Sequence, residues 1–333
     1  MSWYNVSGPE CDVVVSTRCR FARNCKDHKF PSKMSLEESE KLISEISDGF
    51  LKTESDFRLI KTRELKSSEL LTLFEKHLIS LDLVKKPERS ALLLRDDEEV
   101  SIMLCEEDHI RLQAILPGFQ PEEAYALAEK YEKILSMIIP FAENEQFGFL
   151  SACPANAGTG MRISAMLHLP ALAMTKKIGE TLNSLGKLGL TMRGMYGEGT
   201  GAGCALYQIS NQVALGISCQ EILRRVSGII RRTADAEMKT REAILKNNTA
   251  EISNRCLRSL AILKNSYSLS FTELLAFLSD VRMGASLGIV GVPYEKISNL
   301  LVSGAPACII SSAGITDAAK RDVYRAEMAK KLL

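Results

Sequence analysis

The sequence predicts an α+β fold in which helices flank a largely antiparallel sheet and a small all-helical domain follows. Strand-like segments are frequent in the first two-thirds of the 333 residues. Several follow one another with no helix between them, which favours antiparallel pairing over βαβ winding. Beyond about residue 250 the strand signals stop. We therefore expect a large α+β domain over residues 1–250 and a helical domain over residues 251–333.

The expected strands are short segments rich in Val, Ile, Leu and aromatic residues. They are Asp12–Thr17, Phe57–Lys61, Ala91–Arg95, Val100–Leu104, Arg111–Leu116, Phe147–Ala152, Leu190–Tyr196 and Cys204–Ser210. A glycine-bearing loop, Asn156–Gly160, follows the sixth of these segments, and we expect it to lead into a helix.

Two helices of the first domain have clear boundaries in the sequence. Ser35 and Glu38 form a capping box ahead of an apolar periodic stretch, which predicts a helix start. Pro121 suits the first turn of a second helix, because its missing N–H needs no partner there. Pro140 is expected to end that second helix.

A long helix is expected to close the first domain. Ser218 and Glu221 form its capping box, and its apolar period continues to about Lys246. The segment Asn247–Thr249 breaks the pattern. Further helices are expected to open at Ser270 with Glu273, at Pro293, and at Thr316–Asp317.

Composition excludes several classes of protein. The chain has 42 Lys and Arg against 41 Asp and Glu, so its net charge of +1 argues against a nucleic-acid or membrane-surface protein. Nine cysteines with no Cys-x-x-Cys pair indicate neither a disulfide framework nor a zinc module, so we expect a reducing, cytoplasmic setting. The segment Met1–Gly8 does not resemble a signal peptide, and no apolar run approaches the roughly 20 residues of a membrane span.

Residues 105–111 concentrate charge directly after an expected strand. Glu106, Glu107 and Asp108 stand together, followed by His109 and Arg111. Adjacent carboxylates repel one another, so a cation is expected between or beside them. The alternative is a charged turn after an edge strand.

Five arginines lie at expected strand ends and loop edges. Arg18 and Arg20 share one side of an extended segment. Arg111, Arg162 and Arg193 belong to three other segments. Guanidinium groups bind phosphate oxygens bidentately and keep their charge, so the set predicts a polyphosphate site. The alternative for each is a separate surface salt bridge.

A glycine-rich segment carries a further acid. Gly197–Gly203 has no nucleotide-binding glycine register, and Gly179–Lys187 lacks the P-loop spacing. We interpret Gly197–Gly203 as a loop that closes over a substrate, the alternative being a hairpin tip. Glu198 on this loop is expected to face Glu106 and Glu107 across a cleft, an arrangement that suits a guanidinium.

Three further features allow a chemical and a structural interpretation. Cys153 precedes Pro154, and such a residue is most often a small buried apolar group. The chain has only four histidines, His77 among them, which argues against a metal cluster. Arg321 and Arg325 share a helix face beside Asp322, which suits an anion but also fits a solvated charged face.

Four segments together resemble the phosphagen (guanidino) kinase family. They are Ser16–Arg20, Glu106–Arg111, Cys153–Arg162 and Arg193–Glu198, in family order and spacing from about residue 12 to 250. The resemblance implies a glutamine-synthetase-like catalytic domain. The early position of Ser16–Arg20 leaves no room for a helical domain ahead of it, and Arg321–Ala326 matches a motif of the bacterial protein-arginine kinases. Segments Glu75–Ser80 and Tyr207–Gln212 extend the likeness to that branch.

This resemblance assigns expected roles to individual residues. Glu107 is the expected base that positions the guanidinium, Glu198 the second carboxylate, and Cys153 a neighbour of the guanidino group. Arg321, Asp322, Arg325 and Ala326 form an expected allosteric phosphoarginine site. The expected ATP site comprises Ser16, Thr17, Arg18, Cys19, Arg20, His77, Arg111, Arg162, Ile163, Ser164, Ala165, Met166, Arg193, Gly194, Met195, Tyr196, Gly197 and Glu198.

The resemblance also implies cofactors and partners. ATP and Mg²⁺ would serve transfer of a phosphoryl group to proteins with exposed arginine. A homodimer formed by the helical domain, a zinc-binding activator protein and a Clp chaperone-protease that degrades marked proteins are the implied partners.

Two departures from the family pattern leave alternatives open. Cys105 stands where the family has Asn, and the loop after Glu198 lacks a further acid. One alternative is a kinase for free guanidino compounds. The other is a phosphoarginine-binding adaptor that has lost catalysis.

Overall fold

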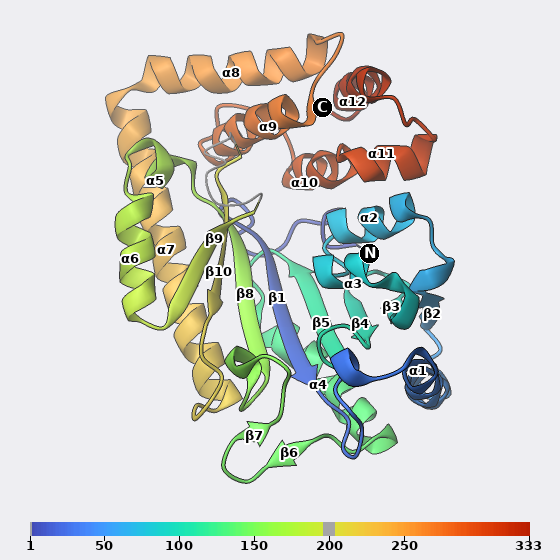
Figure 1. Cartoon of the computed structure of the whole chain (residues 1–333). Helices are drawn as coiled ribbons and strands as arrows, with labels where there is room; N and C mark the ends of the chain where they lie inside the picture. Colours follow the sequence, from blue (N-terminus) through green and yellow to red (C-terminus); the bar gives the residue numbers. More distant parts are fainter. Residues whose placement is uncertain (1, 196–203) are drawn as a thin grey trace.

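The computed structural model describes residues 2–195 and 204–333 and contains one large antiparallel sheet with helices around it (Figure 1). The strand order is β2-β3-β4-β5-β1-β8-β10-β9, and all seven pairings are antiparallel. The strands are β1 Val14–Arg23, β2 Phe57–Lys61, β3 Ala91–Arg95, β4 Val100–Leu104, β5 Ile110–Pro117, β8 Met161–His168, β9 Leu190–Gly194 and β10 Leu206–Asn211, with a small hairpin of β6 Glu143–Asn144 and β7 Gly148–Phe149. The predicted α+β class with an antiparallel sheet is confirmed.

Helices flank the sheet and form the C-terminal part of the chain. In the first part they are α1 Leu36–Leu51, α2 Ser67–Glu75, α3 Leu81–Lys85, α4 Pro121–Ile138, α5 Pro170–Met174, α6 Ile178–Lys187 and α7 Cys219–Asn247. The helices that follow are α8 Thr249–Asn265, α9 Phe271–Ser286, α10 Tyr294–Ser303, α11 Pro306–Ala313 and α12 Ala318–Leu332. The helical C-terminal region expected from the sequence is confirmed.

Local signals explain several of these boundaries. The Ser35 side chain accepts a hydrogen bond from Glu38 N, and the Glu38 side chain accepts one from Ser35 N. Ser218 accepts from the backbone N–H of Glu221 at the start of α7. These bonds satisfy N–H groups that a helix start leaves unpaired, so the helices begin where the sequence predicts.

Three expectations about the strands were wrong in detail. The loop ending at Gly160 leads into strand β8, not a helix, because Gly160 turns with a φ of +60° and its carbonyl accepts from Ala22 N, which lays the next residues along β1. Strand β1 continues to Arg23, so Arg18 and Arg20 lie within it and not at its end. Of the expected strand Phe147–Ala152, only Gly148–Phe149 is extended and paired.

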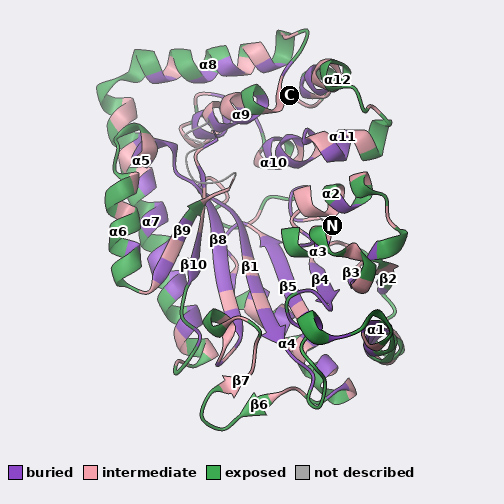
Figure 2. Cartoon of the chain, in the orientation of Figure 1, coloured by how far each residue is buried: buried purple, intermediate pink, exposed green. Residues whose placement is uncertain are grey.

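The two faces of the sheet are covered differently. Helices α1, α4 and α7 pack on one face over the largest hydrophobic core, which holds apolar side chains of the central strands (Figure 2). On the other face, a smaller core that includes Leu70, Leu83, Leu92 and Met103 joins α2 and α3 to strands β3 and β4. The middle of this second face therefore remains available to polar side chains.

Helices α8 to α12 gather at one end of the sheet (Figure 1). Val15, Ile115, Met166 and Leu206 lie near that end of their strands and share a core with the helical part. The sheet and the helical part are therefore joined by packing at the strand ends.

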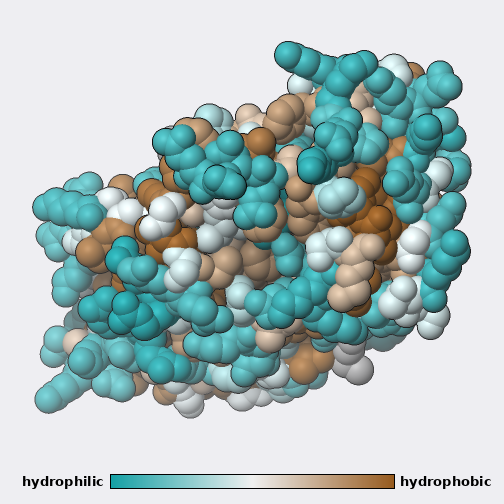
Figure 3. All heavy atoms as spheres, turned by 90° about the horizontal axis from the view of Figure 1, so that it is seen from below, coloured by the Kyte–Doolittle hydropathy of each residue, from teal (hydrophilic) through white to brown (hydrophobic). Residues whose placement is uncertain are grey.

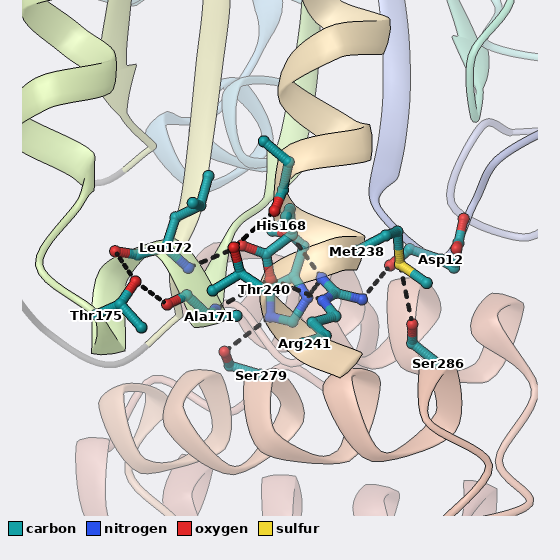
Figure 4. A network of polar contacts seen from close by, with 12 residues as sticks. Asp12, His168, Ala171, Leu172, Thr175, Met238, Thr240, Arg241, Ser279 and Ser286 are labelled. Atoms are coloured by element: carbon teal, nitrogen blue, oxygen red, sulfur yellow. Dashed lines mark hydrogen bonds and ion pairs between the residues drawn. The ribbon is translucent and has the colours of Figure 1, made fainter. Parts of the chain in front are cut away.

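A buried polar network adds to this junction (Figure 4). Arg241 of α7 pairs with Glu237 at 2.7 Å and donates to His168 Nδ1 and to the His168 carbonyl. Since Nδ1 accepts, Nε2 of His168 carries the proton and donates to Ser279 of α9 at 2.8 Å. Glu237 also accepts from the N–H of Ala171 and of Leu172. One network thus connects β8, α5, α7 and α9.

Among residues 2–195 and 204–333, no helix has the length and hydropathy needed to cross a bilayer. The lower face of the molecule, shown in Figure 3, is mostly hydrophilic, with hydrophobic residues in separate areas.

Candidate functional site

Alternation along β1 divides the Ser16–Arg20 segment between the two faces of the sheet. Thr17 and Cys19 are fully buried on the α4 side, where Cys19 belongs to the main core and Thr17 donates to the Gly118 carbonyl. Ser16, Arg18 and Arg20 point to the opposite face. Only the latter three can reach a ligand with their side chains.

Register brings residues from the neighbouring strands to the same face. Arg20 lies opposite Gln113 of β5 and Arg162 of β8, and Arg18 lies opposite Ser164. Directly opposed residues in an antiparallel sheet point the same way, so Gln113, Arg162 and Ser164 share this face. By the same alternation, Ile163 and Ala165 of β8 face the main core and do not reach the site.

Two adjacent pockets occupy this face. The first is lined by Arg20, Phe21, Ala22, Asp82, Glu107, Asp108, Arg111, Cys153, Ala155, Asn156, Gly160 and Arg162. The second is lined by Ser16, Arg18, Phe74, His77, Ile115, Ser164, Met166, Arg193, Gly194, Met195 and Gln208. Because Arg18 and Arg20 are two residues apart on β1, the pockets adjoin along that strand. All five predicted arginines therefore line one or the other of these two pockets.

The arginines influence one another electrostatically. Burial and the charges of Arg111 and Arg162 lower the pKa of Arg18 to about 10. Burial, then Arg18, Arg111 and Arg162, lower the pKa of Arg20 well below its usual range. Burial and the charges of Arg193 and Arg111 lower the pKa of Arg162. Such mutual repulsion is relieved by an anion, which fits the predicted polyphosphate site.

The adjacent acids Glu106 and Glu107 have different partners. Glu106 is buried, accepts from Arg111 Nη1 at 2.7 and 2.9 Å, and also accepts from the Ser80 hydroxyl. Glu107 is exposed and lines the first pocket together with Cys153. Burial, followed by the charges of Asp108 and Glu106, raises the pKa of Glu107. The cation expected beside the acidic cluster is thus Arg111, and Glu107 is the acid left to face a ligand.

Asp108 and Asn24 hold the segment that carries Cys153, a role the sequence analysis missed. Asp108 Oδ1 accepts from Asn24 Nδ2 at 2.6 Å and from Ala152 N at 2.7 Å. The Asn24 side chain also accepts from His109 N. These bonds tie the end of β1, the acidic segment and the Cys153 segment into one unit.

His77 lies in the second pocket in an unusual conformation. Its φ is +63°, a left-handed value, and Gln113 Nε2 donates to its carbonyl at 2.7 Å. Its ring atom Nε2 is buried and has no partner within the described residues. Burial and the charge of Arg18 lower the pKa of His77 to about 4, so the imidazole is neutral near pH 7. A buried polar atom that lacks a partner beside a pocket is suited to a ligand.

Some predicted residues fall outside the described part, and some useful ones were not predicted. Tyr196, Gly197 and Glu198 lie outside residues 2–195 and 204–333, so the convergence of Glu198 with Glu107 stays a prediction. Asp82, Gln113 and Gln208 belong to the site region but were missed. Gln113 lies two residues after Arg111 in β5, so the two side chains point to the same face of the sheet. Strand alternation could therefore have revealed Gln113.

Cys105, which departs from the family pattern, adopts a left-handed conformation. Its φ is +55°, and its side chain is fully buried in the main core. Asn tolerates this backbone region better than most residues, which fits the expectation, drawn from the sequence resemblance, of Asn at this position.

The C-terminal motif divides into a partly exposed and a buried half. Arg321 and Asp322 are both partly exposed, and Arg321 donates to the Thr316 carbonyl. Arg325 is buried and donates to the carbonyls of Gly304 and Leu269, both at 2.7 Å, and it pairs with Asp322. Ala326 is fully buried. Arg325 therefore anchors the local fold, and Arg321 with Asp322 forms the accessible part of the motif.

No cluster of three or more His, Cys, Asp or Glu side chains in the described ranges has the arrangement of a metal site.

Comparison with protein families gives two matches in succession. The model described as "ATP:guanido phosphotransferase, C-terminal catalytic domain" matches residues 38–240. The model described as "Protein-arginine kinase McsB C-terminal domain" matches residues 249–333.

Solved structures share the fold. A duplicated taurocyamine kinase from Schistosoma mansoni is 25% identical with a TM-score of 0.60, covering 67% of this chain and 33% of that chain. A lombricine kinase is 21% identical with a TM-score of 0.60, covering 70% and 68%, and its likeness shows the fold alone.

Curated relatives match over nearly the whole chain. A protein-arginine kinase of Moorella thermoacetica is 41% identical over 99% of this chain and 97% of its own length. One from Bacillus subtilis is 38% identical over 100% and 93%, respectively. With such identity over the full length, this chain belongs to the protein-arginine kinase family, within the ATP:guanido phosphotransferases.

Proposed function

We propose that the chain transfers the γ-phosphoryl group of ATP to arginine side chains of proteins. The observation that carries this proposal is the first pocket, in which Glu107 and Cys153 lie beside Arg20, Arg111 and Arg162. A cationic region for phosphate and an acid for a guanidinium are the two halves that such a transfer requires. The names of the curated relatives support the same reaction.

The residues of the second pocket fit a nucleoside. Ile115, Met166 and Met195 supply apolar surface for a base, and the buried Nε2 of His77 offers a hydrogen bond that no described residue takes. Arg18 and Arg193 in the same pocket are placed for phosphate oxygens. The triphosphate would then run along β1 from the second pocket to the first.

Mg²⁺ would be held largely by phosphate oxygens, with acids of the first pocket such as Glu107 and Asp82 nearby. Its contribution when bound is to neutralise charge on the transferring phosphoryl group. The protein's own residues supply the remaining neutralisation through Arg20, Arg111 and Arg162.

The acceptor arginine would enter between Glu107 and Glu198, with Cys153 beside its guanidino group. One guanidinium nitrogen gives its proton to the Glu107 carboxylate as it forms the bond to the γ-phosphorus. The bond from that phosphorus to the bridging oxygen breaks, and ADP leaves with the electron pair. The guanidinium is a weak nucleophile while protonated, so orientation and proton removal are the main tasks of the two acids.

The two parts of the chain would have different roles. Residues 1–250 would form the phosphotransferase domain, and residues 251–333 a helical domain for dimerisation and regulation. The accessible Arg321 and Asp322 would bind phosphoarginine, with Arg325 and Ala326 supporting them from the core. The sequence resemblance further suggests a cytoplasmic homodimer, a zinc-binding activator protein and degradation of marked proteins by a Clp protease.

Mass spectrometry without acid steps tests the reaction, since the P–N bond is acid-labile. A model protein with exposed arginines is incubated with this chain and Mg-ATP, and phosphoarginine on that protein is the expected product. If the chain binds ATP but no phosphorylated arginine is detected, the proposal is overturned.

Two other functions compete with it. The shared fold with taurocyamine and lombricine kinases favours a kinase for free guanidino compounds as second candidate. Robust turnover of free arginine with ATP, exceeding turnover of protein arginine, would favour it. A non-catalytic adaptor would instead bind phosphoarginine tightly and consume no ATP with any protein.

A further inference from the structure

Helix α11 begins without a capping side chain of its own. Its N-cap residue is Ala305, which has no side-chain acceptor, and Pro306 occupies the first helical position. The next two backbone N–H groups, of Ala307 and Cys308, need acceptors from elsewhere. Both donate to one residue distant in sequence, Glu75, at 3.1 Å to Oε1 and 2.9 Å to Oε2.

Glu75 is the last residue of α2, so this cap joins the helical part to the sheet domain. The Thr72 hydroxyl, one turn earlier in α2, also donates to the Ala307 carbonyl at 3.0 Å. A carboxylate at a helix N-terminus is favoured by the helix dipole as well as by the two hydrogen bonds. The contact therefore fixes the end of α2 against the start of α11 (Figure 1).

The end of α2 leads directly to the second pocket. Two residues after Glu75, His77 takes its left-handed conformation, and its N–H donates to the Phe74 carbonyl at 2.9 Å. This turn aims the imidazole at the pocket, where Nε2 is buried and has no partner among the described residues. A shift of the α2 end would displace His77, because only the Lys76 residue separates it from Glu75.

The start of α11 is fixed to the C-terminal motif as well. Arg325 donates to the Gly304 carbonyl at 2.7 Å, one residue before the Ala305 cap position. A side chain at Gly304 would lie 2.5 Å from Leu274 Cδ2, so this turn is tightly packed. Contacts thus run from Arg325 through the α11 start and Glu75 to His77.

We infer that Glu75 is a positioning residue: by capping α11 it places His77 for the nucleotide and couples the helical domain to the nucleotide pocket. The inference rests on the proposed function, because it requires nucleotide in the second pocket. Coupling is reciprocal, so bound nucleotide also stabilises the start of α11.

A double-mutant cycle on ADP affinity, measured by calorimetry on the full chain, tests this inference. Glu75→Gln removes the charge, keeps the size, and is expected to weaken ADP binding about five- to tenfold. In the His77→Ala background the same change is expected to alter affinity by less than about twofold, because residues that act through each other are not additive. Glu64→Gln, an exposed acid of the same domain, is the matched control and should leave affinity unchanged.

Adding Ala305→Ser to Glu75→Gln separates positioning from simple stabilisation. The serine gives α11 a cap of its own, so the thermal midpoint should recover, while ADP affinity stays weak. Recovery of both would show that Glu75 only stabilises α11 and would overturn the inference. This double variant also keeps the test informative if Glu75→Gln alone fails to fold.

Hydrogen exchange supplies a readout that does not depend on affinity. ADP should increase protection of the Ala307 and Cys308 amides in the wild type and not in Glu75→Gln. Two results would contradict the coupling of Glu75 to His77. One is an unchanged ADP affinity in Glu75→Gln, and the other is an equal effect of Glu75→Gln in the wild type and in the His77→Ala variant. If His77→Ala and Arg193→Ala also leave ADP affinity unchanged, the nucleotide pocket itself is wrongly assigned, and the proposed function fails first.

Discussion

Glu106 accepts two hydrogen bonds from Arg111 Nη1, at 2.7 and 2.9 Å, across the loop that joins β4 to β5. The Glu106 side chain is only 1% exposed and that of Arg111 is 25% exposed. The pair therefore fixes the direction of one arginine of the cationic region, and it leaves Glu107 as the acid that faces the pocket.

Glu106→Gln should weaken ATP binding more than it slows the chemical step. The amide cannot hold Arg111 with charge-assisted bonds, so Arg111 loses its fixed orientation. We expect KM for Mg-ATP to rise about tenfold with kcat within about threefold of the wild type, on the scale of one charged hydrogen bond. Steady-state kinetics at several ATP concentrations measure both constants. A fall in kcat alone would mean that Glu106 acts on the transferring group.

The raised pKa of Glu107 predicts a shifted acid limb of activity. A base must be ionised, so kcat/KM should fall with decreasing pH at a value above 4.5, the ordinary pKa of Glu. Partial burial of Glu107 causes the rise in its pKa, and the neighbouring charges of Asp108 and Glu106 add to it. A pH–rate profile for protein phosphorylation, quenched at neutral pH, measures it. An acid limb below 4.5 would exclude Glu107 as the base.

The ionised Glu107 carboxylate should also lower the free energy of unfolding at neutral pH. Its proton is held more strongly in the folded state than in the unfolded state, so stability falls as pH rises through the range between the two pKa values. Glu107→Gln is therefore expected to keep or raise the thermal midpoint at pH 7. A lower midpoint would indicate a structural role for this carboxylate.

His77 makes folding stability depend on pH in the acid range. Its pKa is about 4 in the folded state against 6.5 ordinarily, so the unfolded chain binds an extra proton between these values. Stability is lost as pH falls from 6.5 to 4, by about 2–3 kcal/mol from this residue. His77→Gln should reduce that loss in urea unfolding curves measured at pH 7 and pH 5. An equal loss in the variant would contradict the burial of a neutral imidazole.

Breaking the buried ion pair of Glu237 and Arg241 should be strongly destabilising. Both side chains are 0% exposed, and Arg241 also donates to the His168 carbonyl (Figure 4). Arg241→Met leaves a buried carboxylate without its charged partner and should cost about 3–5 kcal/mol in the free energy of unfolding.

A matched surface pair provides the comparison for that change. Arg58 and Asp96 lie 3.2 Å apart with side chains 50% and 69% exposed. Arg58→Met should cost about 0–1 kcal/mol, because solvent screens the pair. Similar losses at both sites would mean that the buried network contributes little to the junction between sheet and helical part.

Sequence signals predicted elements best where a local interaction decides the structure. The Ser35–Glu38 and Ser270–Glu273 boxes form both of their hydrogen bonds, because capping involves residues only three apart. The segment after Gly160 was mispredicted because its strand conformation comes from pairing with β1, which lies more than 130 positions earlier in the sequence. In this pairing Arg162 lies opposite Arg20.

The candidate site shows the same limit. Arg18 and Arg20 were placed on one face by strand alternation alone. The link from Asp108 to Ala152 joins segments that only tertiary packing brings together, so it could not be found from spacing. The burial of Arg325 could not be predicted from the sequence either, because its partners Gly304 and Leu269 come from other turns of the helical part.

The most direct test of the central claim is the yield of phosphoarginine on a model protein from Glu107→Gln, measured by acid-free mass spectrometry together with its ADP affinity. We expect the yield per unit time to fall about 10²- to 10⁴-fold, as for loss of a positioned base, with ADP affinity within about twofold of the wild type. Near-normal phosphorylation by this variant would contradict the assignment of Glu107 and of the pocket around it.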